Sequence, residues 1–295
     1  MAYTLSQAAV LAPNPLSKGV IQVFADNPLF DVMPFETIAG NALSYTRSAS
    51  LGNADFRALN AGYPESTPTF TNHVAELKRL GQDADVDRFL VVTQNGASNL
   101  EDLRAAAVVS NTQAVRAKFI DTMINGDGTG ESFEGLEAMG IKEVEGPEGG
   151  FGTSGDTRQD MFDAIDELIG SVVGGPSVLL MGDAMLSRFK SAGRREAALA
   201  DINNFGRSLQ AYAGIPILSA GRNDDGEPVI AGDDIYAVRL AADGVHGITA
   251  RGIEAYDLGE LDTKPTYRTR IEFYCAVVMR HPEAAAVLRA AEVTP

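Results

Sequence analysis

The stretch from Ser98 to Asn125 reads SNLEDLRAAAVVSNTQAVRAKFIDTMIN, and it predicts a single long helix. Ser98 and Glu101 have the spacing of a capping box, in which each side chain satisfies a free backbone N–H of the first turn. Alanines raise the helix propensity, and neither Pro nor Gly interrupts the run before Gly126. At about 1.5 Å per residue the helix would be roughly 40 Å long. We therefore expect it to be the spine of the fold.

One face of this helix should be apolar and should pack against the rest of the chain. The expected face combines residues at spacings of three, four and seven, which lie on one side of a helix: Leu100, Leu103, Ala107, Ala114 and Ala117. Four larger side chains widen this face toward the end of the helix: Phe119, Ile120, Met123 and Ile124. The helix is therefore expected to be held by burial along most of its length.

The sequence before the helix predicts an arm. Residues 1–43 contain one amphipathic helix over Ser17–Phe24, and two prolines then bracket a crowded run of large apolar side chains. Phe30 lies inside this run and Phe35 directly follows it. Large apolar groups on an irregular segment must be buried, either in the chain's own core or against a neighbouring molecule.

Residues 44–93 predict a strand, a long loop and a second strand. The loop, Leu51–Pro68, carries Phe56, Leu59 and Tyr63 without the spacing of a helix or a strand. A loop of about 20 residues without structure of its own is usually functional or disordered. After the loop, three alternating aspartates are interpreted most simply as the solvated face of a strand: Asp83, Asp85 and Asp87.

The sequence after the helix predicts an α/β domain and then a long hairpin. Residues 137–250 alternate helices and strands. Ser177–Met181 has the pattern of a buried strand, and Asp183 begins a helix. Ile215–Leu218 is expected to be an edge strand or a short strand, because its proline cannot donate to a ladder. Ile253–Val278 predicts the long hairpin, and the whole chain is expected to be α+β.

Composition narrows the class of protein. The chain has 295 residues with 45% hydrophobic content and a formal net charge of −16. This acidity disfavours a protein that grips phosphate backbones, because such binding needs clustered Lys and Arg. The single Cys275 excludes an internal disulfide framework. No apolar run is long enough to predict a membrane span, and the first residues do not resemble a secretory signal.

No arrangement of residues predicts catalysis or a cofactor site. Nucleophilic catalysis needs a base within reach of a nucleophile, and the three histidines, His73, His246 and His281, lie in unrelated sequence contexts. The sequence contains no nucleophile elbow, no phosphate-binding glycine loop and no His pair at zinc-binding spacing. The Gly-rich turn after Asn125 resembles a calcium loop, but Leu136 stands where a bidentate Glu is required. We predict no catalytic residue, no metal and no cofactor.

Taken in order, these segments resemble the major capsid proteins of HK97-type bacteriophages. Three segments carry the resemblance besides the long helix: the arm over Gly19–Phe35, the turn Asn125–Gly128 with Phe133–Leu136, and Arg270–Phe273 with Arg280–Ala284. The resemblance implies an HK97-like capsid fold in five parts. These are an N-terminal arm (1–43), an extended E-loop (44–93), a P-domain spine helix (94–136), an α/β A-domain (137–250), and a P-domain long hairpin with a C-terminal return (251–295).

The resemblance also implies a function, which is self-assembly through hexamers and pentamers into an icosahedral shell around double-stranded DNA. The partners would be further copies of the chain, a portal protein, and scaffold or decoration proteins. The shell would enclose DNA without sequence-specific binding and without a membrane. It would be assembled in the host cytoplasm and found in the virion. The expected contact residues between subunits are Phe30, Phe35, Phe56, Leu59, Tyr63, Arg268 and Arg270.

Two alternatives stay open at the level of the sequence. The same fold also builds encapsulin nanocompartments, which enclose a cargo enzyme instead of a genome. A hydrolase with an unrecognised site is the more remote alternative.

Some capsid proteins of this family form a covalent cross-link between an E-loop Lys and an Asn, with a Glu as the catalyst. Glu272 falls near the position of that Glu, but no Asn follows Asn223 in this sequence. We therefore expect a noncovalent shell, in which Glu272 has a structural role.

Overall fold

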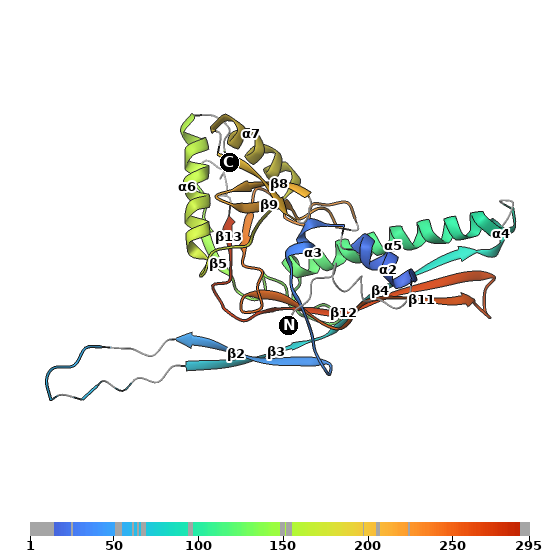
Figure 1. Cartoon of the computed structure of the whole chain (residues 1–295), viewed down its shortest axis with the longest axis horizontal. Helices are drawn as coiled ribbons and strands as arrows, with labels where there is room; N and C mark the ends of the chain where they lie inside the picture. The colour runs from blue at the N-terminus through green and yellow to red at the C-terminus, as the bar shows by residue number, and fades with distance from the viewer. Residues whose placement is uncertain are drawn as a thin grey trace.

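The computed structural model describes residues 15–24, 26–50, 55–60, 62, 63, 65, 69–93, 97–147, 151, 155–196, 198–204, 207–223 and 225–289. Figure 1 shows three parts: a body that contains the long helix, a thin hairpin that projects from the body, and a second domain of sheet and helices.

The body consists of helices packed on a four-stranded sheet. Its long helix is α5 (Ala97–Asn125), so the expected spine helix is confirmed. The sheet has the order β1-β11-β12-β4, and its strands are β1 (Phe35–Thr37), β11 (Val245–Glu260), β12 (Thr266–Met279) and β4 (Lys78–Asp87). Three short helices complete the body: α2 (Pro15–Phe24), α3 (Pro28–Val32) and α4 (Arg88–Thr93). The expected hairpin is β11–β12, which begins earlier than the sequence predicted.

Toward the end of α5 the expected apolar face is confirmed, because Phe119, Ile120, Met123 and Ile124 are buried, whereas in the middle of the helix the buried face is rotated by about one residue. Its fully buried positions run through Val108, Thr112, Val115 and Phe119. Ala107, Ala114 and Ala117, which were expected to be buried, are only half-buried. The pattern was misread because buried Thr112 is polar, and its hydroxyl donates to the Val108 carbonyl oxygen at 2.6 Å. The expected capping box and Leu100 and Leu103 lie outside the described side chains.

The arm is anchored in the body by an aromatic cluster. The rings of Phe24 and Phe30 have centroids 4.6 Å apart, and the centroid of Phe119 lies 5.5 Å from Phe30 and 5.6 Å from Phe273. Phe30 and Phe35 have only 0% and 5% of their surface exposed. Of the two environments that the sequence left open for this apolar run, the structure selects the chain's own core.

The projecting hairpin is formed by β2 (Ala42–Ser50) and β3 (Thr69–Glu76), which form a two-stranded sheet of their own. In Figure 1 it extends away from the body on the side opposite the N-terminal end of α5, which lies next to α4. The hairpin ends at Glu76, whereas the sequence extended this segment to residue 93. The difference arises because β4 pairs with β12 and so belongs to the body sheet.

The second domain is a seven-stranded sheet with two helices, α6 (Gly155–Ser171) and α7 (Asp183–Glu196). In order across the sheet, the strands are β5 (Lys142–Glu145), β13 (Ala285–Arg289), β10 (Ile235–Val238), β6 (Val178–Met181), β9 (Ile215–Ser219), β8 (Arg207–Tyr212) and β7 (Leu199–Asn204). The expected buried strand and the helix from Asp183 are confirmed.

Two strands of this sheet can be compared with the sequence expectation. β9 is a short strand, which is one of the two alternatives expected, and it lies between β6 and β8 and not at the edge. Pro216 is tolerated there because β8 and β9 share only two residue pairs. β13 lies in the segment that the resemblance assigned to the P-domain as a C-terminal return, yet it pairs with β10 on one side and β5 on the other.

Candidate assembly interfaces

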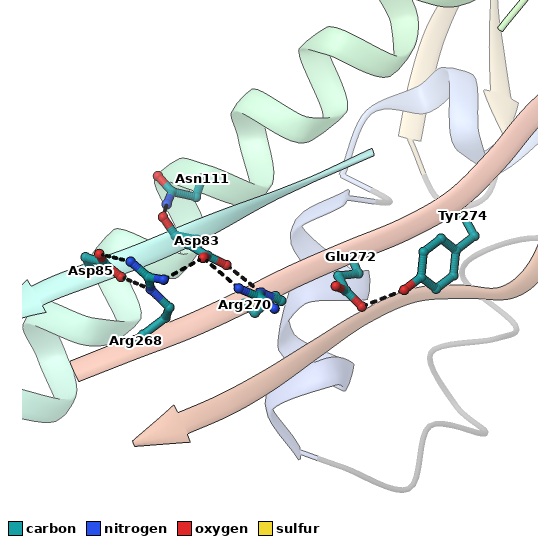
Figure 2. Close-up of polar contacts among 7 residues, drawn as sticks. All are labelled: Asp83, Asp85, Asn111, Arg268, Arg270, Glu272 and Tyr274. Carbon is teal, nitrogen blue, oxygen red and sulfur yellow. Dashed lines mark hydrogen bonds and ion pairs between the residues drawn. The ribbon is translucent and has the colours of Figure 1, made fainter. Parts of the chain in front are cut away.

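Two arginines and two aspartates face each other across β4 and β12. The antiparallel register places Arg268 opposite Asp85 and Arg270 opposite Asp83. Both pairs are bidentate, with nitrogen–oxygen distances of 2.7 and 2.6 Å in the first pair and 2.8 and 3.0 Å in the second. Figure 2 shows the two pairs side by side, joined by a further contact of 3.1 Å between Arg268 and Asp83. We call these four residues the Arg/Asp ladder.

Asp85 and Asp87 are exposed and Asp83 is half-buried, so the expected solvated face is confirmed, and the Arg/Asp ladder adds ion pairs that the sequence analysis did not anticipate. Hydrogen bonds from Arg270 lower the pKa of the Asp83 carboxyl, and hydrogen bonds from Arg268 lower the pKa of Asp85. The physical cause is that a charged donor stabilises the ionised carboxylate. The sequence contained the signal, because Asp83-x-Asp85 and Arg268-x-Arg270 have the same period of two, but only the register shows that they meet.

The spine helix and Glu272 border the Arg/Asp ladder. Asn111 of α5 donates to the Asp83 carbonyl oxygen at 3.2 Å, which ties the helix to β4. Glu272 accepts a hydrogen bond of 2.8 Å from the Tyr274 hydroxyl (Figure 2).

The far end of the projecting hairpin exposes large apolar side chains. Phe56, Leu59 and Tyr63 have 100%, 92% and 71% of their surface exposed, and we call these three residues the hairpin tip. Arg57 lies over the Tyr63 ring, with its guanidinium carbon 5.1 Å from the ring centroid. Exposed apolar side chains of this size, carried on a slender projection, mark a surface that binds another molecule.

The root of the hairpin is fastened to the body by three arginine and lysine contacts. Arg47 donates to the Met279 carbonyl oxygen at 2.7 Å, and Lys78 donates to the Gly130 carbonyl oxygen at 3.0 Å. Arg79 forms an ion pair of 2.8 Å with Glu131. A cavity of about 300 Å³ lies between the hairpin and the turn that follows α5. The hairpin is therefore held at its base, where Tyr45 of β2 and Ala75 of β3 also pack against the buried core.

The sequence matches no family model and no curated protein. Its structure, however, matches solved structures along nearly the whole chain. A chain of Mycobacterium phage Bobi aligns with a TM-score of 0.63 at 13% identity, covering 95% of this chain and 92% of that chain. A chain of the holo-SrpI encapsulin complex from Synechococcus elongatus aligns with a TM-score of 0.61 at 17% identity, covering 90% and 88%. The virus-like particle from Pyrococcus furiosus gives 0.59 at 11% identity, covering 93% and 97%.

The chain has the HK97 fold. The fold class expected from the sequence is confirmed, and the α+β architecture with a long helix, a projecting hairpin and a second domain is the observed one. At identities of 11–17% the likeness establishes this fold and leaves the function to be argued from the surfaces.

On this HK97 fold, the residues expected to contact neighbouring subunits fall into three groups. Phe30 and Phe35 are buried in the chain's own core, so we no longer propose them as contacts. Arg268 and Arg270 have carboxylate partners within the chain, which removes the reason for expecting them to reach another copy. Phe56, Leu59 and Tyr63 are exposed and remain proposed contact residues.

Sequence reasoning missed a second exposed apolar surface at the opposite end of the body. Phe89 and Leu90 of α4 have 71% and 46% of their surface exposed. Asp87 accepts from the Phe89 backbone N–H at 2.7 Å and so caps this short helix. The sequence analysis did not predict this short helix.

The described residues contain no group of three or more His, Cys, Asp or Glu side chains placed to hold a metal ion. His246 is buried, and His73 and His281 lie in other parts of the structure. Cys275 is also buried, which raises the pKa of its thiol well above the ordinary value. No described helix is long and apolar enough to cross a membrane.

Proposed function

We propose that this chain is a major capsid protein, which assembles through hexamers and pentamers into the icosahedral shell of a tailed bacteriophage. The observation that carries the proposal is the hairpin tip, because Phe56, Leu59 and Tyr63 are exposed on a projection of an HK97 fold. Burying apolar surface yields roughly 25 cal/mol per Å², so a second copy of the chain that covers these side chains gains binding free energy.

The chemistry of the chain supports a structural role in place of an enzymatic one. Among the described residues no group of three or more His, Cys, Asp or Glu side chains could hold a metal ion, and the ionisable side chains of the Arg/Asp ladder are paired with each other. The net charge of −16 suits a lining that leaves packaged double-stranded DNA free to move. In this proposal the further partners are a portal protein and scaffold or decoration proteins, and the shell is assembled in the host cytoplasm.

A second candidate is the shell of an encapsulin-like nanocompartment. The observation that favours it is the alignment to the Synechococcus elongatus encapsulin complex, which covers 90% of this chain. The two candidates differ in what the particle encloses, so nuclease-protected DNA in particles from the native source supports the capsid. A stoichiometric second protein inside DNA-free particles supports the nanocompartment.

The assembly proposal is tested by replacing the hairpin tip. Negative-stain imaging and analytical ultracentrifugation of the purified chain should show closed shells. The triple variant Phe56→Ser, Leu59→Ser and Tyr63→Ser should remain folded by circular dichroism but should not form shells.

The matched control is Val173→Ser, which changes an exposed apolar side chain of the second domain. This control should assemble normally. Normal shells from the triple variant would contradict the role of the hairpin tip. Monomers from the unmodified chain over a wide range of concentration and salt would contradict the capsid proposal itself.

A further inference from the structure

Buried polar atoms that lack a well-formed hydrogen bond gather where the arm meets the body sheet. Within the described part of the chain, four buried side-chain polar atoms lack such a bond, and three of them lie here. They are both ring nitrogens of His246 on β11 and Nε of Arg280, which directly follows β12. The ring has only weak contacts, with the Gly244 backbone and with Glu36. Such clusters are rare in folded proteins, since an unpaired buried polar group costs free energy. This cluster therefore calls for a physical role.

The partner that completes the cluster belongs to the arm. Oε2 of Glu36, on β1, lies 2.7 Å from Arg280 Nη2 and 3.3 Å from His246 Nε2. Arg280 and Glu36 are half-exposed, whereas the His246 side chain is only 1% exposed. One carboxylate of the arm is thus shared by a permanent cation and by a titratable ring buried beneath it.

The arm passes directly over this cluster and is held by a short pairing. β1 pairs with β11 through only three residues, and the Gly247 N–H donates to the Pro34 carbonyl oxygen at 3.0 Å. The approach is so close that a Cβ on Gly247 would lie 2.3 Å from the Phe35 ring. A change at His246, the residue before Gly247, would therefore act on the strand that ties the arm to the body.

The surroundings of His246 favour its neutral form. Burial lowers the pKa of the imidazole, Arg280 lowers it further, and Glu36 acts in the opposite direction. Glu36 from β1 and Arg280 beyond β12 are the charged groups that act on the ring among the described residues, and its cross-strand neighbour on β12 is apolar Val278. A proton on the ring would place two cations against one half-exposed carboxylate.

We propose that Glu36, His246 and Arg280 form an acid-sensitive latch, which holds the arm on the body sheet while His246 is neutral and loosens it when His246 takes up a proton. The sign follows from linkage. Because the folded chain binds this proton less readily than the unfolded chain, docking of the arm weakens as the pH falls below the ordinary histidine value of about 6.5. This inference concerns the chain itself and holds whether or not the chain forms a capsid.

Hydrogen exchange of the full chain tests the latch. Exchange is measured by mass spectrometry at pH 7.5 and 5.5, with correction for the intrinsic rate, on peptides that cover residues 28–37. We expect protection of this segment to fall at the lower pH by up to about tenfold, the limit set by the distance of one pH unit between 5.5 and the ordinary histidine value of about 6.5. A peptide that covers β6 should show no such fall. Equal protection of residues 28–37 at both pH values would overturn the proposal.

Variants separate the titration of His246 from a purely structural role. His246→Gln cannot take up the proton, so its protection should not depend on pH, whereas the control His281→Gln should behave as the unmodified chain. Arg280→Gln should reduce the pH-dependent loss, and Glu36→Gln should enlarge it, because they remove charges of opposite sign. If His246→Gln does not fold, the last two variants still decide the matter. A loss of the same size in all variants, or shifts of Arg280→Gln and Glu36→Gln in the same direction, would overturn the latch.

Discussion

At the scale of single residues, the Arg/Asp ladder shows which features a sequence can predict and which it cannot. Its arginines and its aspartates each alternate with a period of two, so each pair could be assigned to one strand face from the sequence alone. That they pair with each other depends on the register of β4 against β12, two strands separated by most of the chain. No local pattern specifies that register, and this is why the sequence indicated a solvated face but not the ion pairs on it.

The double variant Asp83→Asn and Asp85→Asn should unfold at a lower temperature than the unmodified chain at pH 7, by a few degrees. Both carboxyls have lowered pKa values, so their contribution is present above the unfolded value of about 3.9 and is lost as the pH falls through the lower folded values. Thermal midpoints at pH 7 and pH 3 measure this difference, which should shrink at pH 3. The control is Asp262→Asn in the β11–β12 turn. A difference that persists at pH 3 would exclude the ion pairs as its cause.

A second prediction at this scale concerns Glu272, which is hydrogen-bonded to Tyr274. Because no Asn follows Asn223 and the only cysteine is buried, copies of the chain should be held together without covalent bonds. Assembled particles boiled in SDS without reductant should give one band near 31.2 kDa. A ladder of higher bands would refute this expectation.

At the scale of elements, the extent of α5 was predictable and the phase of its buried face was not. Uninterrupted helix-forming residues and the stop at Asn125–Gly126 define the length of the helix. The buried stripe includes Thr112. An analysis based on the spacing of apolar residues assigns this polar residue to the exposed face. Its hydroxyl is satisfied within the helix, so burial at this position needs no partner from the sheet.

Thr112→Val should therefore change the free energy of unfolding by no more than about 1 kcal/mol, and the change can be stabilising. Valine has nearly the same shape, and the Val108 carbonyl oxygen keeps its place in the helix. Urea denaturation of the dissociated chain measures the effect. The comparison variant Thr112→Asp buries a charge without a partner and should prevent folding. A loss above about 2 kcal/mol for Thr112→Val would mean that the hydroxyl has a further, unidentified role.

At the scale of the whole molecule, the order of the parts could be predicted and their partners in the sheets could not. The sequence indicated the arm, the long loop, the spine helix, the second domain and the final hairpin in the right succession. It did not indicate that β4 pairs with β12 of the body sheet, or that β13 pairs with β5 in the second domain. Both are pairings between distant segments, for which short-range periodicity holds no information. The hairpin tip was predicted because large apolar residues in a long loop, without the spacing of a helix or a strand, can be recognised from the local sequence.

The acidity of the molecule leads to a prediction about assembly. Copies that each carry a net charge of −16 repel one another, and salt screens this repulsion, with a screening length of about 8 Å near 0.15 M. Light scattering should therefore show faster assembly as salt rises from low to moderate concentration, because apolar burial drives association. In a gel-shift experiment the chain should not retard duplex DNA at physiological ionic strength. Assembly that weakens steadily with added salt would instead identify ion pairs between copies as the main attraction.

The position of β13 also determines when the second domain can complete its sheet during synthesis. Residues 285–289 fill the gap between β5 and β10, so the second domain cannot close its sheet until this late segment has left the ribosome. The body must wait nearly as long, since β12 ends at Met279. Neither part can be completed on a nascent chain that lacks these strands. A nascent chain from which β12 and β13 have not yet emerged therefore cannot offer finished surfaces to neighbouring copies.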